Sequence, residues 1–338
     1  MKKKINLYQK DGWVDVRSIL DAGFIFNFIT GGRGIGKTYG FIRWMIEHGH
    51  TFILLRRTEI ESQLQADPKT SSVTAVCNDM GITFHTAVHG KKMRSLYRDD
   101  TDQEICLCAA LSTFASVRGV DLSAYQYIIY DEFITEPHVR PLKMEGIALS
   151  NAYETINRNR ELAGLDPVRL LALSNSLNIS NDIFMQFDLV SAAEKMISED
   201  IEVYQRGNLL LLILQHSPIS AKKAETALYQ TASEEYARMS IRNEFIMNDF
   251  RYVKKQPLKE YVPVWSVGDL TIYEHKNRNE FYVSFSKAKL PKSQQYGSNY
   301  MDLTRMKRDH IRTWWNYLDG LIKFENYKAV SLFEKYFA

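Results

Sequence analysis

The sequence predicts a mixed α/β fold in which a mostly parallel, doubly wound sheet is followed by a helical linker and a small α+β domain. Three observations support this prediction. Apolar strands and helices alternate between residues 24 and 176, which is typical of a parallel sheet. A polar helical stretch then covers 219–250. From Tyr261 the pattern changes to short valine-rich strands separated by turns. We therefore expect a first domain at 1–205, a linker at 206–255 and a C-terminal domain at 256–338.

The composition is that of an ordinary globular protein, but its charge is unevenly distributed. The length of 338 residues allows two domains, and 45% hydrophobic with 25% charged residues is usual for such proteins. Residues 251–338 contain 16 Lys and Arg against 9 Asp and Glu, whereas residues 1–250 contain 27 against 31. The basic C-terminal quarter fits either a polyanionic partner or a lysine-rich surface without a partner.

The cysteines and apolar segments indicate a cytoplasmic protein that does not enter a membrane. Three cysteines without disulfide spacing are typical of a reducing compartment. The basic start of the chain lacks the apolar segment of a signal peptide. The longest aliphatic run, 209–214, is too short to cross a bilayer.

The strongest local signal is the stretch GGRGIGKT at residues 31–38. It matches G-x-x-x-x-G-K-[ST], a loop whose backbone N–H groups surround nucleotide phosphates, whose lysine reaches the β- and γ-phosphates and whose hydroxyl holds Mg²⁺. A predicted strand at 24–30 precedes the loop and a predicted helix at 39–48 follows it, so the helix N-terminus adds its positive end. The alternative, a glycine-rich turn, does not explain this context. The predicted ATP-binding residues are Gly31, Gly32, Arg33, Gly34, Ile35, Gly36, Lys37 and Thr38.

Further apolar runs predict the remaining strands of the first domain. They cover 51–55, 105–111, 124–130 and 168–173, and a last strand pair is expected near 201–214. Helical segments are expected near 59–65 and at 149–161. Ligands of parallel sheets bind at the carboxyl ends of the strands, so polar residues that follow these runs are candidate site residues.

Asp131 and Glu132 directly follow the predicted strand at 124–130. A strand-terminal aspartate can hold Mg²⁺, as the Walker-B aspartate does, and an adjacent glutamate can accept a proton from the attacking water. Their position about 90 residues after the phosphate-binding loop indicates the P-loop NTPase class that has an additional strand between the two signature strands and a catalytic glutamate. Asn175, after the next strand, is either a γ-phosphate sensor or a turn or helix-capping residue.

Two arginines, Arg158 and Arg160, lie at the end of the predicted helix at 149–161. One of them can act as an arginine finger, which stabilises the charge of the transferred phosphoryl group and is often supplied by a neighbouring subunit. The alternative is a solvated helix face.

With these motifs the chain resembles the DNA-packaging (encapsidation) ATPases of phi29-like small tailed phages. The matching segments keep their order over almost the whole chain, and the last two are not catalytic, so they discriminate better than the nucleotide-binding motifs do. The resemblance rests on residues 28–38, 55–57, 131–134, 158–161, 173–175, 239–246 and 320–326.

The resemblance implies an ATPase domain, a helical linker and a vestigial RNase H-like domain that assemble as a pentameric ring at the capsid vertex. It implies that Arg158 reaches the next subunit, and that the C-terminal domain contacts nucleic acid, including a structural packaging RNA. It also implies double-stranded DNA and the portal (connector) of the procapsid as partners, in the cytoplasm of the infected cell. Residues 261–338 lack a clustered set of strand-borne carboxylates, so we expect no nuclease activity.

The function expected from these features is an ATP-driven translocase of double-stranded DNA. Lys37 and Glu132 would act in catalysis together with Arg158, and Thr38 and Asp131 would hold Mg²⁺. Two alternatives remain at this stage. One is a helicase-like or DNA-repair ATPase, although strand-separating motifs are not recognised. The other is a non-catalytic, nucleotide-stabilised nucleic-acid binding module.

Overall fold

The computed structural model describes residues 4–89, 93–117, 119–135, 139–175, 178–231 and 252–337. Contacts divide the chain into two compact units. The first comprises Met1–Asn178 and Lys195–Ile246, and the second comprises Ile179–Glu194 and Met247–Ala338. Among the described residues, no helix is both long and apolar enough to cross a membrane.

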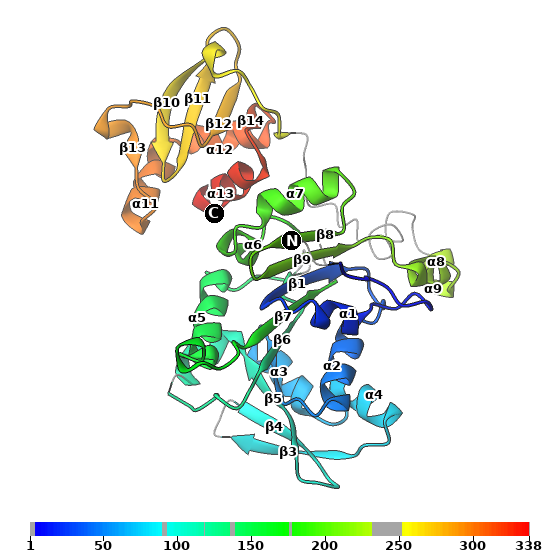
Figure 1. Cartoon of the computed structure of the whole chain (residues 1–338). Helices are drawn as coiled ribbons and strands as arrows, with labels where there is room; N and C mark the ends of the chain where they lie inside the picture. Colours follow the sequence, from blue (N-terminus) through cyan, green and yellow to red (C-terminus); the bar gives the residue numbers. More distant parts are fainter. Residues whose placement is uncertain are drawn as a thin grey trace. The chain divides into compact units, whose positions relative to one another are not determined.

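Nine strands form the sheet of the first unit, in the order β3-β4-β5-β2-β6-β7-β1-β9-β8 (Figure 1). The pairings from β5 through β9 are parallel. Antiparallel pairings of β3 with β4, β4 with β5 and β8 with β9 complete the two edges. This confirms the mixed α/β class with a mostly parallel sheet. The strands are β1 (Phe26–Gly31), β2 (Phe52–Arg56), β3 (Phe84–His89), β4 (Met93–Arg98), β5 (Glu104–Ala110), β6 (Tyr127–Asp131), β7 (Arg169–Ser174), β8 (Val203–Arg206) and β9 (Leu209–Leu214).

Helices cover both faces of this sheet because its central strands are apolar on both sides. One face packs on α1, α2 and α4 in a core that includes Ile29, Phe41 and Val76. On the other face, α5 places Tyr153 against Phe26, with ring centroids 4.8 Å apart. The helices that begin and end in this unit are α1 (Val16–Asp21), α2 (Lys37–Glu47), α3 (Glu59–Ala66), α4 (Ser72–Asp79), α5 (Glu145–Asn157), α8 (Pro218–Ala224) and α9 (Ala227–Thr231), with 3₁₀ helices η1 (Leu111–Val117) and η2 (Glu161–Ala163).

The second unit contains a five-stranded mixed sheet in the order β13-β10-β11-β12-β14. Strands β10, β11 and β12 are antiparallel neighbours, whereas β13 and β14 pair in parallel at the edges. Ion pairs of Lys335 with Asp182 at 2.5 Å and of Lys328 with Asp188 at 2.6 Å hold α13 to the segment Ile179–Glu194. The elements are α6 (Asp182–Gln186), the start of α7 (Val190–Ser198), η4 (Leu258–Glu260), β10 (Tyr261–Val267), β11 (Leu270–His275), β12 (Phe281–Ser284), η5 (Lys292–Gln294), β13 (Gln295–Tyr296), α11 (Tyr300–Asp309), α12 (Ile311–Leu318), β14 (Ile322–Phe324) and α13 (Tyr327–Phe337).

The structure adds elements that the sequence patterns did not predict and moves several boundaries. Helix α4 and the β3–β4 hairpin fill the region before 104 that lacked a clear pattern. Helix α5 begins at Glu145 and ends at Asn157, earlier than the predicted 149–161. The hairpin of β8 and β9 crosses the domain boundary expected at residue 205, because β9 pairs with β1. In the expected linker, α8 and α9 are helical, while 232–251, including the segment 239–246, lie outside the described residues.

Candidate active site

The predicted phosphate-binding loop connects β1 to α2 at the carboxyl edge of the sheet. Strand β1 ends at Gly31 between β7 and β9, and α2 begins at Lys37. Gly34 and Gly36 have φ angles of +70° and +88°, which side chains with a Cβ rarely adopt. The predicted strand–loop–helix arrangement is therefore present, with the N-terminus of α2 directed at the loop.

The ammonium group of Lys37 lies inside this loop. Its Nζ donates hydrogen bonds to the carbonyl oxygens of Gly31 and Gly32, both at 2.8 Å, and to Oδ1 of Asn175 at 2.9 Å. Burial lowers the pKa of Lys37 to about 7, and the positive charges of Lys223 and Arg33 act in the same direction, whereas Asp131 opposes them. An anion in the loop would supply the negative charge that this lysine needs.

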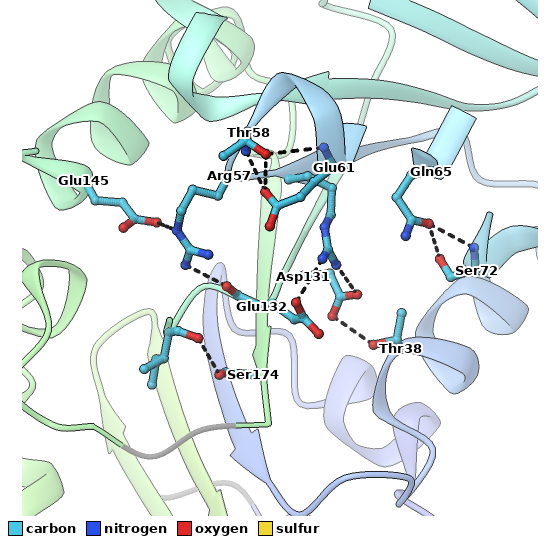
Figure 2. Close-up of polar contacts among 12 residues, drawn as sticks. Thr38, Arg57, Thr58, Glu61, Gln65, Ser72, Asp131, Glu132, Glu145 and Ser174 are labelled. Carbon is cyan, nitrogen blue, oxygen red and sulfur yellow. Dashed lines mark hydrogen bonds and ion pairs between the residues drawn. The ribbon is translucent and has the colours of Figure 1, made fainter. Parts of the chain in front are cut away.

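Thr38 and Asp131 meet where α2 begins and β6 ends (Figure 2). The hydroxyl of Thr38 donates a hydrogen bond of 2.9 Å to Oδ1 of Asp131. On its other side, Oδ2 of Asp131 accepts a hydrogen bond of 2.8 Å from Arg56, which ends β2. Burial raises the pKa of Asp131, while Arg56 and Thr38 act in the opposite direction. A hydroxyl and a carboxylate are oxygen donors of the kind that Mg²⁺ prefers, so these residues fit that ion.

Glu132 lies beside Asp131 but is more exposed, with 46% of its side chain accessible. Its Oε2 accepts a hydrogen bond of 3.0 Å from Arg56. Its φ of +58° is unusual for a residue with a side chain and is typical of strained positions at functional sites. Arg57 holds this backbone, because it donates a hydrogen bond of 2.8 Å to the Glu132 carbonyl and another of 2.9 Å to the buried Glu145 of α5.

Local sequence explains why Arg56 and Arg57 stay at this place. Arg56 ends β2 and Arg57 follows it. Thr58 then caps the start of α3 with a capping box, in which Thr58 and Glu61 satisfy each other's backbone N–H groups (Figure 2). The turn from strand to helix is thereby fixed directly after the two arginines.

Asn175 joins the site through β7, which lies between β1 and β6 in the sheet. Thr30 pairs with Ser174, and Asp131 pairs with Leu173, so the ends of the three strands are level. A cavity of about 200 Å³ opens beside Asn175 and Glu132, with room for a few water molecules.

Arg158 and Arg160 are not part of this cluster. Arg158 donates a hydrogen bond of 2.7 Å to the carbonyl of Val120, and Arg160 donates one of 2.8 Å to the carbonyl of Ser123. The preceding residue, Asn157, accepts a hydrogen bond from the N–H of Val168, just before β7 begins. Arg158 therefore lies at the amino edge of the sheet, about 20 Å of strand away from the phosphate-binding loop. Its φ of +45° is again unusual.

Two contributions to the site were not assigned from the sequence. Arg56 was recognised only as a strand-end residue, and its bridge to both acids depends on the pairing of β2 with β6. Lys223 of α8 donates a hydrogen bond to the carbonyl of Arg33 in the phosphate-binding loop. No local sequence signal places Lys223 there, because 190 residues separate the two.

Comparisons with known proteins agree on one family. A family model described as Podovirus DNA encapsidation protein (Gp16) matches residues 8–332. The DNA packaging protein of Bacillus phage PZA is 26% identical over 319 residues, which are 89% of this chain and 90% of that protein. The DNA packaging protein of Bacillus phage phi29 matches to the same extent.

Two solved structures have a similar fold over nearly the whole chain. The Phi-28 gp11 DNA packaging motor has a TM-score of 0.69 at 18% identity, covering 97% of this chain and 98% of that one. The bacteriophage Phi-29 viral genome packaging motor assembly has a TM-score of 0.65 at 21% identity, covering 98% of this chain and 100% of that one.

Proposed function

Because this chain belongs to the family of podovirus DNA encapsidation proteins (Gp16), we propose that it is an ATPase that drives double-stranded DNA into a phage procapsid. One observation supports the ATPase activity above all others. Lys37, Thr38, Asp131 and Glu132 come from two distant parts of the chain and lie together at the carboxyl edge of one sheet. A binding module without catalysis would need the phosphate-binding loop but not the paired acids.

The side chains have distinct roles in the proposed hydrolysis. The loop N–H groups and Lys37 bind the β- and γ-phosphates of ATP. Mg²⁺, held by Thr38 and Asp131, would neutralise phosphate charge. Glu132 accepts a proton from the attacking water, a new bond forms between the water oxygen and the γ-phosphorus, and the bond to the bridging oxygen breaks, which yields ADP and phosphate. Asn175, which contacts Lys37, is placed to respond to the γ-phosphate.

The position of β7 supports the assignment to the P-loop NTPase class with an additional strand. In the sheet, β7 separates β1, which leads into the phosphate-binding loop, from β6, which ends at Asp131. A strand in this place is what the additional-strand class, expected from the position of Asp131 and Glu132, would contain. The RNase H-like fold of the C-terminal domain remains a prediction.

The place of Arg158 supports a role in a neighbouring subunit. Because it lies at the opposite edge of the sheet from Lys37, it cannot reach a nucleotide bound in its own chain. A finger that acts in trans requires an assembly in which one subunit's amino edge faces the next subunit's loop, as in a ring. We therefore propose a homo-oligomeric ring, a pentamer by resemblance. Arg160 is the alternative finger.

The proposed partners follow from the family and from charge. The relatives named above package DNA, and the basic C-terminal quarter suits contacts with phosphates, which require no sequence readout. We propose double-stranded DNA, a structural packaging RNA and the procapsid portal as partners of the ring. The site of action is then the cytoplasm of the infected cell, transiently at the procapsid vertex.

Two substitutions test the proposed ATPase. Lys37→Ala should abolish ATP hydrolysis, and Glu132→Gln should bind ATP but turn it over about 100- to 10,000-fold more slowly, because a general base contributes that much. Asp100→Asn is the matched control, since Asp100 is an exposed carboxylate paired with Arg98. Normal hydrolysis by Glu132→Gln would refute the assignment of the base.

The same preparation separates the alternatives. ATP binding without phosphate release, with DNA and procapsids present, would favour a non-catalytic module. Unwinding of a short DNA duplex would favour a helicase. DNA that becomes protected from nuclease inside procapsids, only when ATP is hydrolysed, is the result expected of the packaging motor.

A further inference from the structure

A groove of about 830 Å³ begins at the phosphate-binding loop and follows the outer face of α2. One wall is a stripe of α2 residues at helical spacing, and the other wall is the N-terminal segment with the start of α1. Such a volume is typical of small-molecule sites and exceeds what a phosphate group fills. The residues used below are Gln9, Trp13, Gly34, Gly36, Tyr39 and Gly40.

Trp13 is held rigidly at the end of the groove nearest the loop. The backbone of its segment is fixed by hydrogen bonds from Gln9 N to the Trp13 carbonyl at 2.7 Å and from Val14 N to the Ile35 carbonyl at 3.2 Å. The indole packs so closely on Gly36 that a Cβ there would lie 3.0 Å from the ring. Nevertheless 43% of Trp13 is exposed. A fixed aromatic ring is therefore presented to solvent next to the predicted phosphate site.

Specific contacts also determine the shape of the floor and the rim of the groove. Gly40 lets α1 approach α2, because a Cβ at this position would lie 2.9 Å from Val16. On the rim, the Tyr39 hydroxyl donates a hydrogen bond of 2.7 Å to Asp79 and accepts one of 3.1 Å from Arg43. Tyr39 directly follows Thr38, so the groove starts where a bound nucleotide would extend away from its phosphates.

We propose that this groove binds the base of the nucleotide, and that it selects adenine. In this arrangement the base stacks on Trp13, and the carboxamide of Gln9 pairs with the adenine edge. The proposal rests on the proposed ATPase function, because the phosphates on the loop determine where the base lies. Gly34 and Gly36 line both the loop and the groove, which makes the two sites continuous.

Gln9 supplies the chemical basis for choosing adenine. A glutamine carboxamide can accept a hydrogen bond from N6 and donate one to N7 of adenine, whereas guanine offers acceptors at both O6 and N7. Within the protein, Gln9 Nε2 contacts the Val14 carbonyl at 3.5 Å, a distance at the limit of a hydrogen bond. Breaking this weak hydrogen bond costs little free energy when the Gln9 amide turns toward a base.

The test compares ATP, GTP and inorganic tripolyphosphate, which occupies the loop but has no base. Binding is measured by titration calorimetry with the full chain and its Trp13→Ala, Trp13→Phe and Gln9→Ala variants. Trp13→Ala should raise the Kd for ATP about 10-fold, which is the usual contribution of base stacking, and leave the Kd for tripolyphosphate within about 2-fold. Trp13→Phe, which keeps a ring on Gly36, should bind ATP within about 3-fold of the original protein. Gln9→Ala should bring the affinities for ATP and GTP together.

Controls distinguish the possible failures. Trp315→Ala removes another exposed tryptophan, in the second unit, and should change no Kd. If Trp13→Ala leaves ATP binding unchanged, or weakens ATP and tripolyphosphate equally, the base site is overturned while the phosphate site stands. If the original chain binds neither ATP nor tripolyphosphate, the proposed ATPase function fails and the base site fails with it.

Discussion

Arg56 and Glu132 form an ion pair with an NH2–Oε2 distance of 3.0 Å, and the same guanidinium holds Asp131 at 2.8 Å. Two neighbouring carboxylates repel each other, and burial adds a further cost for Asp131. Arg56, whose side chain is only 10% exposed, offsets both effects. It therefore acts as a positioning residue that holds the metal-binding and proton-accepting carboxylates close together and opposes the rise in the pKa of Asp131.

The Arg56→Met variant should lose ATPase activity at acidic pH, where the original protein is still active. Burial raises the pKa of Asp131 and Arg56 lowers it, so removal of Arg56 lets this pKa rise further. The carboxylate then becomes protonated at a higher pH, and the acid limb of the rate profile should move to higher pH. Rates between pH 5 and 8 at saturating and low Mg²⁺ measure this shift.

Arg98→Met provides the control for that experiment, because Arg98 forms an ion pair with Asp100 at the surface. Its rate profile should match that of the original protein. An unshifted acid limb in Arg56→Met, with the protein folded, would contradict the role assigned to Arg56.

Arg158→Ala should be inactive alone but should regain activity in mixed rings with Glu132→Gln. The two changes remove complementary halves of a shared site, so a mixed ring contains some interfaces in which an intact Glu132 meets an intact Arg158. Phosphate release should peak near equal mixing. Mixtures that remain inactive at all ratios, although the subunits assemble, would count against a finger acting in trans.

The same mixing experiment with Arg160→Ala decides between the two arginines. Arg160 donates hydrogen bonds to the carbonyls of Asp166 and Ser123 and so braces the loop that follows α5. We expect a modest loss, of about 10-fold or less, that is not restored by Glu132→Gln subunits. If mixed rings regain ATPase activity with Arg160→Ala but not with Arg158→Ala, Arg160 is the arginine finger and Arg158 has the structural role.

Sequence patterns predicted those parts of the site in which a short motif forms one local structure. The loop from Gly31 to Thr38 and the two acids at the end of β6 were predicted because each occupies one strand end, and the parallel sheet then brings the strand ends together. The β3–β4 hairpin was missed, since its strands are half-polar and alternate weakly. Arg56 reaches Asp131 across 75 residues, and its contact depends on which strands are neighbours, which no local pattern specifies.

Lys223→Met should weaken ATP binding more than it slows turnover. The ammonium of Lys223 donates a hydrogen bond to the Arg33 carbonyl, and this orients the next N–H, that of Gly34, to the other side of the peptide plane. Without this hydrogen bond the loop is less well ordered for binding phosphates, so KM should rise by about 10- to 100-fold, the value of one hydrogen bond from a charged group, with kcat within about 2-fold. Lys223→Arg should restore much of the affinity.

The neighbouring Lys222 is the matched control for Lys223, because it lies on the same helix and is exposed. Lys222→Met removes the same charge near the site without the contact to the loop, and its KM should stay within about 2-fold. Equal effects of the two substitutions would indicate a general loss of positive charge rather than a specific contact.

ATP binding should take up a proton and weaken as the pH rises above about 7. Burial lowers the pKa of Lys37 to about 7, so at pH 8 most of the free protein carries this lysine neutral, while the bound triphosphate favours its charged form. In the unfolded chain this lysine keeps its proton up to its ordinary pKa of 10.5, so above pH 7 the unfolded state binds more protons than the folded state. The contribution of Lys37 to the free energy of unfolding therefore increases as the pH rises above about 7. Calorimetry at pH 8 in two buffers of different ionisation enthalpy should give an uptake approaching one proton per ATP, and the Kd should rise by up to about 10-fold per pH unit. Lys222→Met should not change the uptake, whereas binding with no proton exchange would show that Lys37 does not change its charge when ATP binds.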